Sequence, residues 1–101
     1  MKENSKENGK ENNKENKGQF HNRLYECLGR VVSARRKRLA MSQEDLAEKA
    51  NVDRAFISKI EGGKRKPSFG LVSDIARGLH MRFSRLVDNC ERCSRDIKRD
   101  A

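Results

Sequence analysis

The chain has 101 residues, with 24 Lys and Arg against 15 Asp and Glu, and its formal net charge is +9. Such a length holds a single domain, and the scarcity of aromatic residues (5%, with no Trp) argues against a large ligand cleft lined by rings. No apolar run approaches the roughly 18 residues of a membrane helix, and no apolar leader follows Met1. We therefore expect a cytoplasmic protein that binds neither a membrane nor a small-molecule substrate.

The first 19 residues form a low-complexity repeat. Lys-Glu-Asn recurs at 2–4, 6–8, 10–12 and 14–16, and no apolar side chain follows Met1 in this stretch. Such a segment cannot bury apolar surface to offset the entropy of ordering, so it is typical of disorder. We expect a disordered tail over 1–19, a folded domain over 20–89 and a charged extension over 90–101. A recognition tag or degradation signal is the alternative interpretation of the repeat.

The positive charge belongs to the part that is expected to fold. Residues 20–101 contain 19 basic and 11 acidic residues. A basic face is the electrostatic footprint of nucleic-acid binding, although an ordinary solvated surface has the same composition.

Apolar periodicity predicts five helices. The first, over about 22–39, carries Leu24, Leu28, Val31, Val32 and Leu39. Capping residues predict the limits of three others: Ser42 to Asn51, Asp53 to Gly62-Gly63, and Ser68 to about Leu79. Ser84 is the predicted cap of the last helix, which carries Leu86 and Val87 and extends to about Cys90. No segment alternates with a period of two, so the predicted fold is an all-α, compact five-helix bundle.

The second and third predicted helices are joined very tightly. Only Asn51 and Val52 separate the second helix from the cap at Asp53. A join this short forces the two helices to cross steeply, which is the helix-turn-helix geometry.

The segment SQEDLAEKANVDRAFISKIEGGKRKPS, residues 42–68, resembles the Cro/C1-type helix-turn-helix family, also called the XRE family. Asn51 stands where the family usually has Gly, and Phe56 where it usually has a small polar residue. The resemblance covers about residues 24–88 and leaves out the tail beyond Asn89. It implies a lambda-repressor-like DNA-binding domain whose third helix enters the major groove and whose second helix crosses the backbone.

Carried over by position, the resemblance assigns two sets of DNA contacts. The residues expected to read bases are Arg54, Ala55, Phe56, Ser58 and Lys59; Arg and Lys donate to guanine, and Ala and Phe contact the thymine methyl. The residues expected at the DNA backbone are Gln43, Lys64, Arg65, Lys66 and Ser68. For each charged residue the alternative is a solvated surface position. Arg36 and Glu61 are expected to form a structural ion pair between the first and third helices.

The end of the chain suggests self-association. Phe83, Leu86, Val87 and Cys90 fall at i, i+3, i+4 and i+7, and the resemblance implies a homodimer through this region. The alternative is that Leu86 and Val87 close the core of the monomer.

The three cysteines are expected to be free thiols, because an odd count without an export signal does not favour a disulfide framework. Cys90 and Cys93 form a CxxC motif, for which a zinc site, a redox pair and ordinary helix-end cysteines are the three interpretations. No further ligand pair at metal spacing accompanies the motif, so we expect neither a metal nor a cofactor.

The predicted function is sequence-specific binding of double-stranded DNA by a transcriptional regulator, a dimeric repressor or controller that reads a palindromic operator. The alternative is an antitoxin or adaptor whose helix-turn-helix domain mainly binds a protein partner. No catalytic constellation is present in the sequence, so we do not expect an enzyme.

Overall fold

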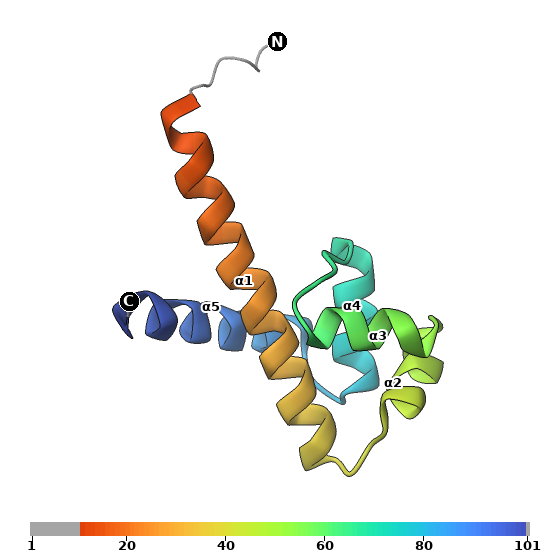
Figure 1. The fold of residues 1–101 in the computed structure, drawn as a ribbon. Coiled ribbons are helices and arrows are strands. Elements are labelled where there is room, and N and C mark those ends of the chain that lie inside the picture. Colours follow the sequence, from red (N-terminus) through yellow and green to blue (C-terminus); the bar gives the residue numbers. More distant parts are fainter. Residues whose placement is uncertain (1–10, 101) are drawn as a thin grey trace.

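The computed structural model describes the backbone of residues 11–100 and the side chains of residues 18–97. This part of the chain forms five helices and no strand (Figure 1): α1 Glu11–Arg38, α2 Gln43–Ala50, α3 Arg54–Glu61, α4 Phe69–Gly78 and α5 Phe83–Asp100. The prediction of an all-α, five-helix fold is confirmed. Among the described helices, none is both long and apolar enough to cross a bilayer.

The first helix begins well before the predicted start near residue 22. Residues 11–19, predicted to be disordered, are helical backbone in the structure, whereas residues 1–10 lie outside the described part of the chain. Helix nucleation is the costly step, and further residues add to an existing helix with little penalty. The repeat also places Glu three residues before Lys, a spacing that favours a helix. The packed part of α1 therefore supports an extension that composition alone does not predict.

The last helix also differs from the prediction at both ends. It begins at Phe83, and the carbonyl of Arg82 accepts hydrogen bonds from the backbone N–H groups of Arg85 (3.0 Å) and Leu86 (3.1 Å). Arg82 thus holds the cap position expected for Ser84. The helix continues to Asp100, so the predicted charged extension over 90–101 is, as far as residue 100, its second half. Leu86, Cys90 and Ser94 extend one buried stripe along it, which explains the continuation.

The predicted caps of the middle helices are mostly confirmed. The Ser42 hydroxyl accepts from the backbone N–H of Asp45 (2.9 Å), whose carboxylate accepts in turn from the N–H of Ser42 (3.0 Å). Asn51 ends α2 in the left-handed conformation, with φ 60° and ψ 48°. Asp53 holds the cap position of α3, although its side chain makes no capping hydrogen bond.

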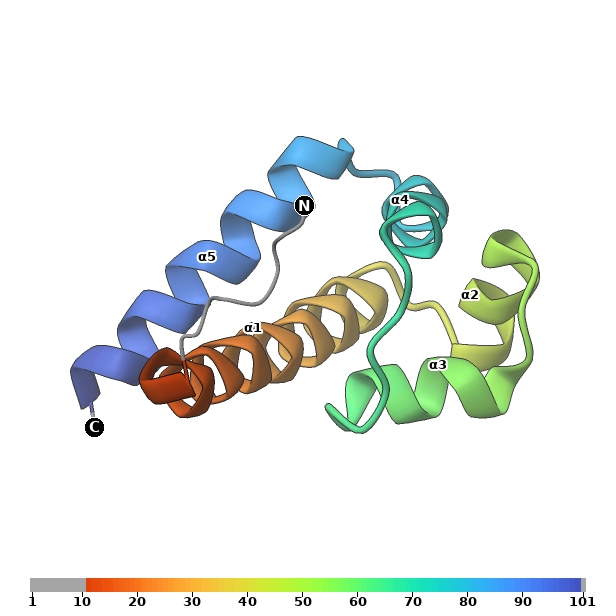
Figure 2. The same cartoon turned by 90° about the horizontal axis from the view of Figure 1, so that it is seen from above.

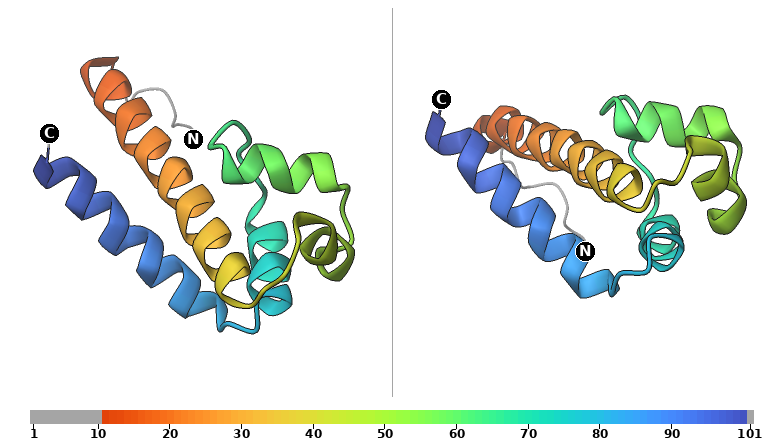
Figure 3. Two further views of the ribbon diagram at one scale, coloured as in Figure 1. Left: turned by 60° about the horizontal axis from the view of Figure 1, so that its bottom comes forward. Right: turned by 90° about the horizontal axis from the view of Figure 1, so that it is seen from below.

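All five helices share one apolar core. Helix α5 packs against α1 and runs back in the opposite direction, while α2, α3 and α4 gather beside the C-terminal half of α1 (Figures 2 and 3). The largest fully buried side chains are Val32, Leu46, Ile57, Ile60, Ile75, Leu79 and Leu86. Because α3 contributes only one stripe to this core, its opposite face is exposed to solvent.

A glycine in the middle of α1 determines how closely α3 approaches. A Cβ atom built on Gly29 would lie 2.5 Å from the carbonyl oxygen of Ile60 and 2.6 Å from that of Glu61. No side chain fits in this space. Gly29 therefore lets the last turn of α3 lie directly on the backbone of α1.

The prediction that all three cysteines are free thiols is wrong. Cys27 of α1 and Cys93 of α5 form a disulfide, with their Cα atoms 5.7 Å apart and a sequence separation of 66. The packing of α5 against α1 brings these two residues together, and no count of cysteines reveals such a pairing. Cys90 is free and buried, and burial raises the pKa of its thiol to about 11.

Candidate nucleic-acid interface

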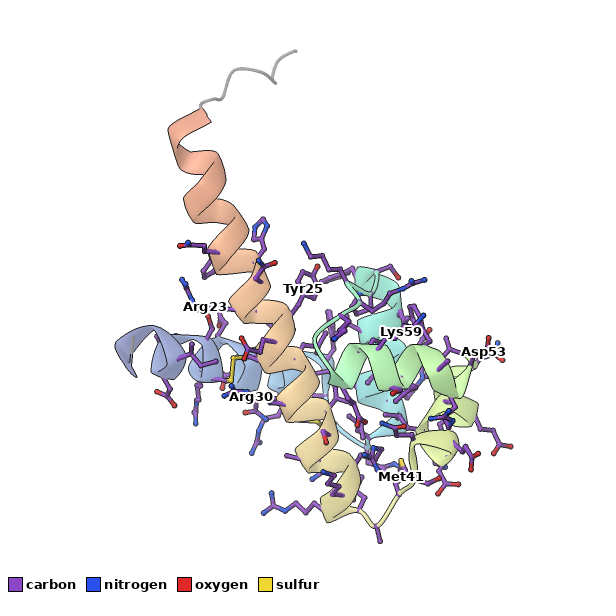
Figure 4. The ribbon with its side chains drawn as sticks, viewed as in Figure 1. Arg23, Tyr25, Arg30, Met41, Asp53 and Lys59 are labelled. Atoms are coloured by element: carbon purple, nitrogen blue, oxygen red, sulfur yellow. A yellow bond between two sulfur atoms is a disulfide. The ribbon has the colours of Figure 1, made fainter. Side chains whose placement is uncertain are left out.

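The exposed face of α3 carries four of the five residues predicted to read bases. Arg54, Ala55, Ser58 and Lys59 are exposed, whereas Phe56 is half-buried and packs against the core. Figure 4 shows Asp53 where α3 begins and Lys59 farther along the helix. Ile57 and Ile60 anchor the opposite side, so the helix presents a short polar surface of positive charge.

Arg54 on the exposed face of α3 is hydrogen-bonded to Gln43 at the start of α2. The guanidinium of Arg54 donates from Nη1 to Oε1 of Gln43 over 3.2 Å. Gln43 in turn donates from Nε2 to Oε1 of Glu61 over 3.0 Å. Because Gln43 is engaged at both ends of its amide, it holds Arg54 in a defined position on the exposed surface.

The predicted ion pair is confirmed and lies beneath this chain. Arg36 donates from Nε to Oε2 of Glu61 (2.7 Å) and from Nη2 to Oε1 (3.0 Å), and the two side chains are 11% and 8% exposed. A third donor, Nη1 of Arg36, bonds the carbonyl of Met41 at 2.8 Å. The bidentate pair thus ties α1, the loop before α2 and the end of α3 together.

The environment of Glu61 keeps it ionised. Burial by itself raises the pKa of this carboxyl group, but the hydrogen bonds from Arg36 and Gln43 and the neighbouring positive charges outweigh burial, so its pKa is lowered. The hydrogen bond to Glu61 raises the pKa of Arg36. At neutral pH the pair is fully charged, and both carboxylate oxygens of Glu61 accept hydrogen bonds from Arg36 or Gln43.

The loop after α3 carries three exposed cations, two of which lie over aromatic rings. The guanidinium of Arg65 is 4.8 Å from the ring centroid of Phe56, and Nζ of Lys66 is 5.7 Å from that of Tyr25. Contacts of this kind attract the cation to the face of the ring. They hold Arg65 beside α3 and Lys66 beside α1, two of the three loop residues predicted to contact the DNA backbone.

The start of α4 lies directly after this loop. The Ser68 hydroxyl accepts from the backbone N–H of Leu71 at 3.1 Å, which confirms the predicted cap. The N–H groups of the first helical residues have no intrahelical acceptor by the geometry of a helix. They are suitable donors for a phosphate oxygen.

The structure corrects half of the predicted dimer surface. Leu86 is fully buried and Cys90 is 8% exposed, so both belong to the core of the monomer. Val87 is 39% exposed, and Phe83 is half-buried and packs edge-on against Phe69, with ring centroids 4.7 Å apart. Phe69 is 77% exposed. We call the pair Phe69 and Phe83 the aromatic patch; Val87 lies one turn after Phe83 on α5.

Sequence reasoning missed three contributors to this region. Phe69 lies on a different helix from the stripe of Phe83, Leu86, Val87 and Cys90, and the sequence does not indicate the hydrogen bond between Gln43 and Glu61. Tyr25, the ring beneath Lys66, lies 41 positions earlier in the sequence. An exposed Phe at the start of a helix is the one signal that could have been found in advance.

Comparison with known proteins agrees with this architecture. Residues 32–86 match the family HTH_3, described as Helix-turn-helix. The immunity repressor protein of Bacillus phage phi105 is 33% identical over 60 residues, which are 59% of this chain and 42% of the repressor. The control protein C.MunI of Mycoplasma sp is 34% identical over 58 residues, covering 57% of this chain and 78% of that protein. The chain thus spans less than half the length of the phage relative.

A solved structure is similar over a larger share. It is the restriction-modification controller protein C.Esp1396I, crystallised as a tetramer with its natural 35 base-pair operator. The TM-score is 0.59 at 32% sequence identity, and the match covers 66% of this chain and 93% of that chain. The matched family segment contains all of α2, α3 and α4 and the Arg36–Glu61 pair. The chain belongs to the helix-turn-helix family, in its Cro/C1-type (XRE) branch.

Proposed function

We propose that this DNA-binding transcriptional regulator inserts α3 into the major groove, where Arg54 and Lys59 read base edges. The observation that carries the proposal is the hydrogen-bonded chain that runs from buried Glu61 through Gln43 to exposed Arg54. An arginine that is already oriented loses less entropy when it binds, and a bidentate contact to guanine N7 and O6 is the commonest specific contact in DNA recognition.

The neighbouring residues supply contacts that position the protein without reading sequence. Lys64, Arg65 and Lys66 follow α3, and the start of α4 offers backbone donors beside Ser68. Contacts of this type make affinity depend on salt. Phe56 differs from the other four residues of α3 because it is half-buried and its ring lies beneath Arg65. Its main role is to position Arg65, and only its exposed part is left to contact a thymine methyl.

We further propose that two copies bind together as a repressor or controller. One recognition helix reads only a few base pairs, too few to identify a site among many competitors. The aromatic patch is the surface that a second copy would cover in a two-fold dimer, which would then read a palindromic operator. The named roles of the relatives, an immunity repressor and control proteins, support this class of function.

The test is selection of bound duplexes from a random pool, followed by titration of the selected sequence against random DNA. Arg54→Ala and Lys59→Ala should each reduce the ratio of specific to nonspecific affinity by roughly 5- to 150-fold, corresponding to about 1–3 kcal/mol. The matched control is Lys49→Ala, which removes an exposed lysine of α2. Recovery of no preferred sequence would contradict the proposal and favour a protein partner.

The loop is tested by salt titration of the same complex. Lys64→Ala should weaken binding to selected and random DNA alike and reduce the slope of log affinity against log salt by about one. A change in base preference would instead place Lys64 among the residues that read sequence.

A further inference from the structure

A basic groove lies between α1 and α5. It has a volume of about 1010 Å³, and α3 contributes none of its lining residues. Five arginines and two aspartates line it, together with His80. The arginines are Arg35, Arg38, Arg82, Arg85 and Arg92. The groove thus has an excess of positive charge that the DNA-binding surface of α3 does not use.

Three of these guanidinium groups are available to a ligand. Arg35 already donates to the backbone carbonyls of Leu79 (3.0 Å) and His80 (3.2 Å). Arg92 pairs with Asp88 at 3.4 Å. By contrast, the side chains of Arg38, Arg82 and Arg85 are exposed, and their guanidinium groups make no hydrogen bond or ion pair with any residue that the structure describes. The groove therefore attracts anions, with Asp88 and Asp96 as the carboxylates that oppose this attraction.

One of the two residues of the Cys27–Cys93 disulfide lines the same groove. Cys93 is half-buried and belongs to the groove lining, whereas Cys27 is completely buried. Figure 4 shows the bond bridging α5 and α1. From this difference in burial we infer that a thiolate in the groove attacks Cys93 in preference to Cys27.

We propose that Cys93 is a thiol–disulfide exchange site whose reactants are small thiols that carry carboxylate groups, which the arginines of the groove concentrate beside it. Electrostatic attraction in a groove raises the local concentration of an oppositely charged reactant and therefore its rate. A neutral or cationic thiol gains no such advantage. The site depends on none of the DNA contacts proposed above.

The exchange proceeds in two balanced steps. The thiolate of the small thiol attacks Cys93 Sγ, the Cys27–Cys93 bond breaks, and a mixed disulfide forms on Cys93 while Cys27 leaves as a thiolate and takes a proton. A second small thiolate then attacks the mixed disulfide at the sulfur of the small thiol and releases Cys93. In total the protein gains two thiols, and two small thiols are oxidised to their disulfide. The reverse steps, driven by that small disulfide, restore the bond.

Exchange frees the second half of α5 without opening the helix-turn-helix core. Both cysteines lie outside residues 32–86, the segment that matches the family. Leu86 of α5 and Ile60 of α3 are fully buried in the core, and their packing does not depend on the disulfide. Beyond Cys90, the disulfide is the covalent link between the described parts of α5 and α1, and Ser94 is buried and Ile97 half-buried beside it. Opening the bond therefore loosens the pairing of α1 with α5 beyond residue 90.

The experiment measures the rate at which the bond opens in the full chain, after oxidation with glutathione disulfide. The reaction is followed by alkylation and mass spectrometry with three thiols: glutathione, 2-mercaptoethanol and cysteamine. To remove differences in intrinsic reactivity, the rate for each thiol is divided by its rate with 2-hydroxyethyl disulfide. At low salt the normalised rate for glutathione should exceed that for cysteamine by about tenfold, and salt should reduce the difference. Equal normalised rates at low salt would overturn the proposal.

Variants separate the groove from the overall charge of the protein. Arg82→Gln with Arg85→Gln removes two of the three available guanidinium groups and should sharply reduce the preference for glutathione. The matched control, Arg77→Gln with Arg95→Gln, removes the same charge from exposed positions outside the groove lining and should leave the preference intact.

The Cys27→Ser variant tests whether Cys93 by itself exchanges with a small disulfide. In this variant, glutathione disulfide should leave glutathione on Cys93 and none on buried Cys90. Hydrogen exchange at residues 91–97 should be faster in the reduced wild type than in the oxidised protein. Modification of Cys90 in place of Cys93, or unchanged exchange at 91–97, would contradict the inference whether or not the DNA proposal holds.

Discussion

Gln43, the first residue of α2, donates a hydrogen bond from its side-chain amide to Glu61, the last residue of α3, over 3.0 Å. Glu61 also accepts two hydrogen bonds from Arg36. One carboxylate therefore joins a buried ion pair to the exposed surface of the helix-turn-helix. The helix that is proposed to read DNA is therefore held at its end by the same contacts that stabilise the fold.

Glu61→Ala should lower the free energy of unfolding by about 3 kcal/mol, because it leaves the largely buried guanidinium of Arg36 without its partner. Urea denaturation at pH 7 measures the change. The matched control is Glu44→Ala, at an exposed position of α2, which should change stability by less than about 0.5 kcal/mol. The double variant with Arg36→Ala should cost less than the sum of the two single variants.

Acid should remove the contribution of Glu61 to stability. Its pKa in the folded protein lies below its ordinary value of 4.5, so the folded state favours the ionised form. That contribution is fully present above about pH 4.5 and is lost as the pH falls through the lower, folded-state pKa. Urea midpoints measured at decreasing pH should fall more steeply for the wild type than for Glu61→Gln. Parallel curves would show that Glu61 is not responsible.

Gly29→Ala should destabilise the protein by roughly 1–3 kcal/mol, because the added methyl group meets the carbonyl of Ile60 and pushes α3 away from α1. Gly18→Ala is the control in the same helix. Nothing lies within 4 Å of a Cβ atom there, so the change should stabilise the helix by about 0.5–1 kcal/mol. Thermal unfolding of the two variants should therefore shift in opposite directions.

Phe69→Asp should abolish self-association at micromolar concentration, because a charge in the aromatic patch opposes its burial against a second copy. Sedimentation equilibrium measures the outcome. Phe20→Asp provides the comparison, since Phe20 is 47% exposed on α1 outside the patch. A wild type that is monomeric throughout, and that binds a half-site as tightly as a palindrome, would contradict the dimer proposal.

The local elements could be predicted from the sequence because their signals are local. Ser42, Asn51 and Ser68 mark helix ends through their own hydrogen bonds or backbone conformation. The apolar stripe of α3 likewise distinguishes Ile57 from Lys59 without any knowledge of the other helices. The order of the helices and the exposed face of α3 follow from these features.

The ends of the chain could not be predicted in the same way. Composition favours disorder for 11–19 and a separate extension after residue 89, but the helical backbone of both depends on helices that are already formed and packed. The limits of α1 and α5 are therefore set by cooperativity, which the local residues do not display.

Contacts between distant residues were decided by the tertiary structure alone. The sequence by itself determined the helix-turn-helix, its caps and the charge of its surface, because each of these rests on neighbours within a turn or two. Only the packing of α5 against α1 brought Cys27 to Cys93, buried Leu86 and Cys90, and left Phe69 beside Phe83 on the surface. A helical stripe shows which residues share a face, but the helix that covers that face is chosen by the whole core.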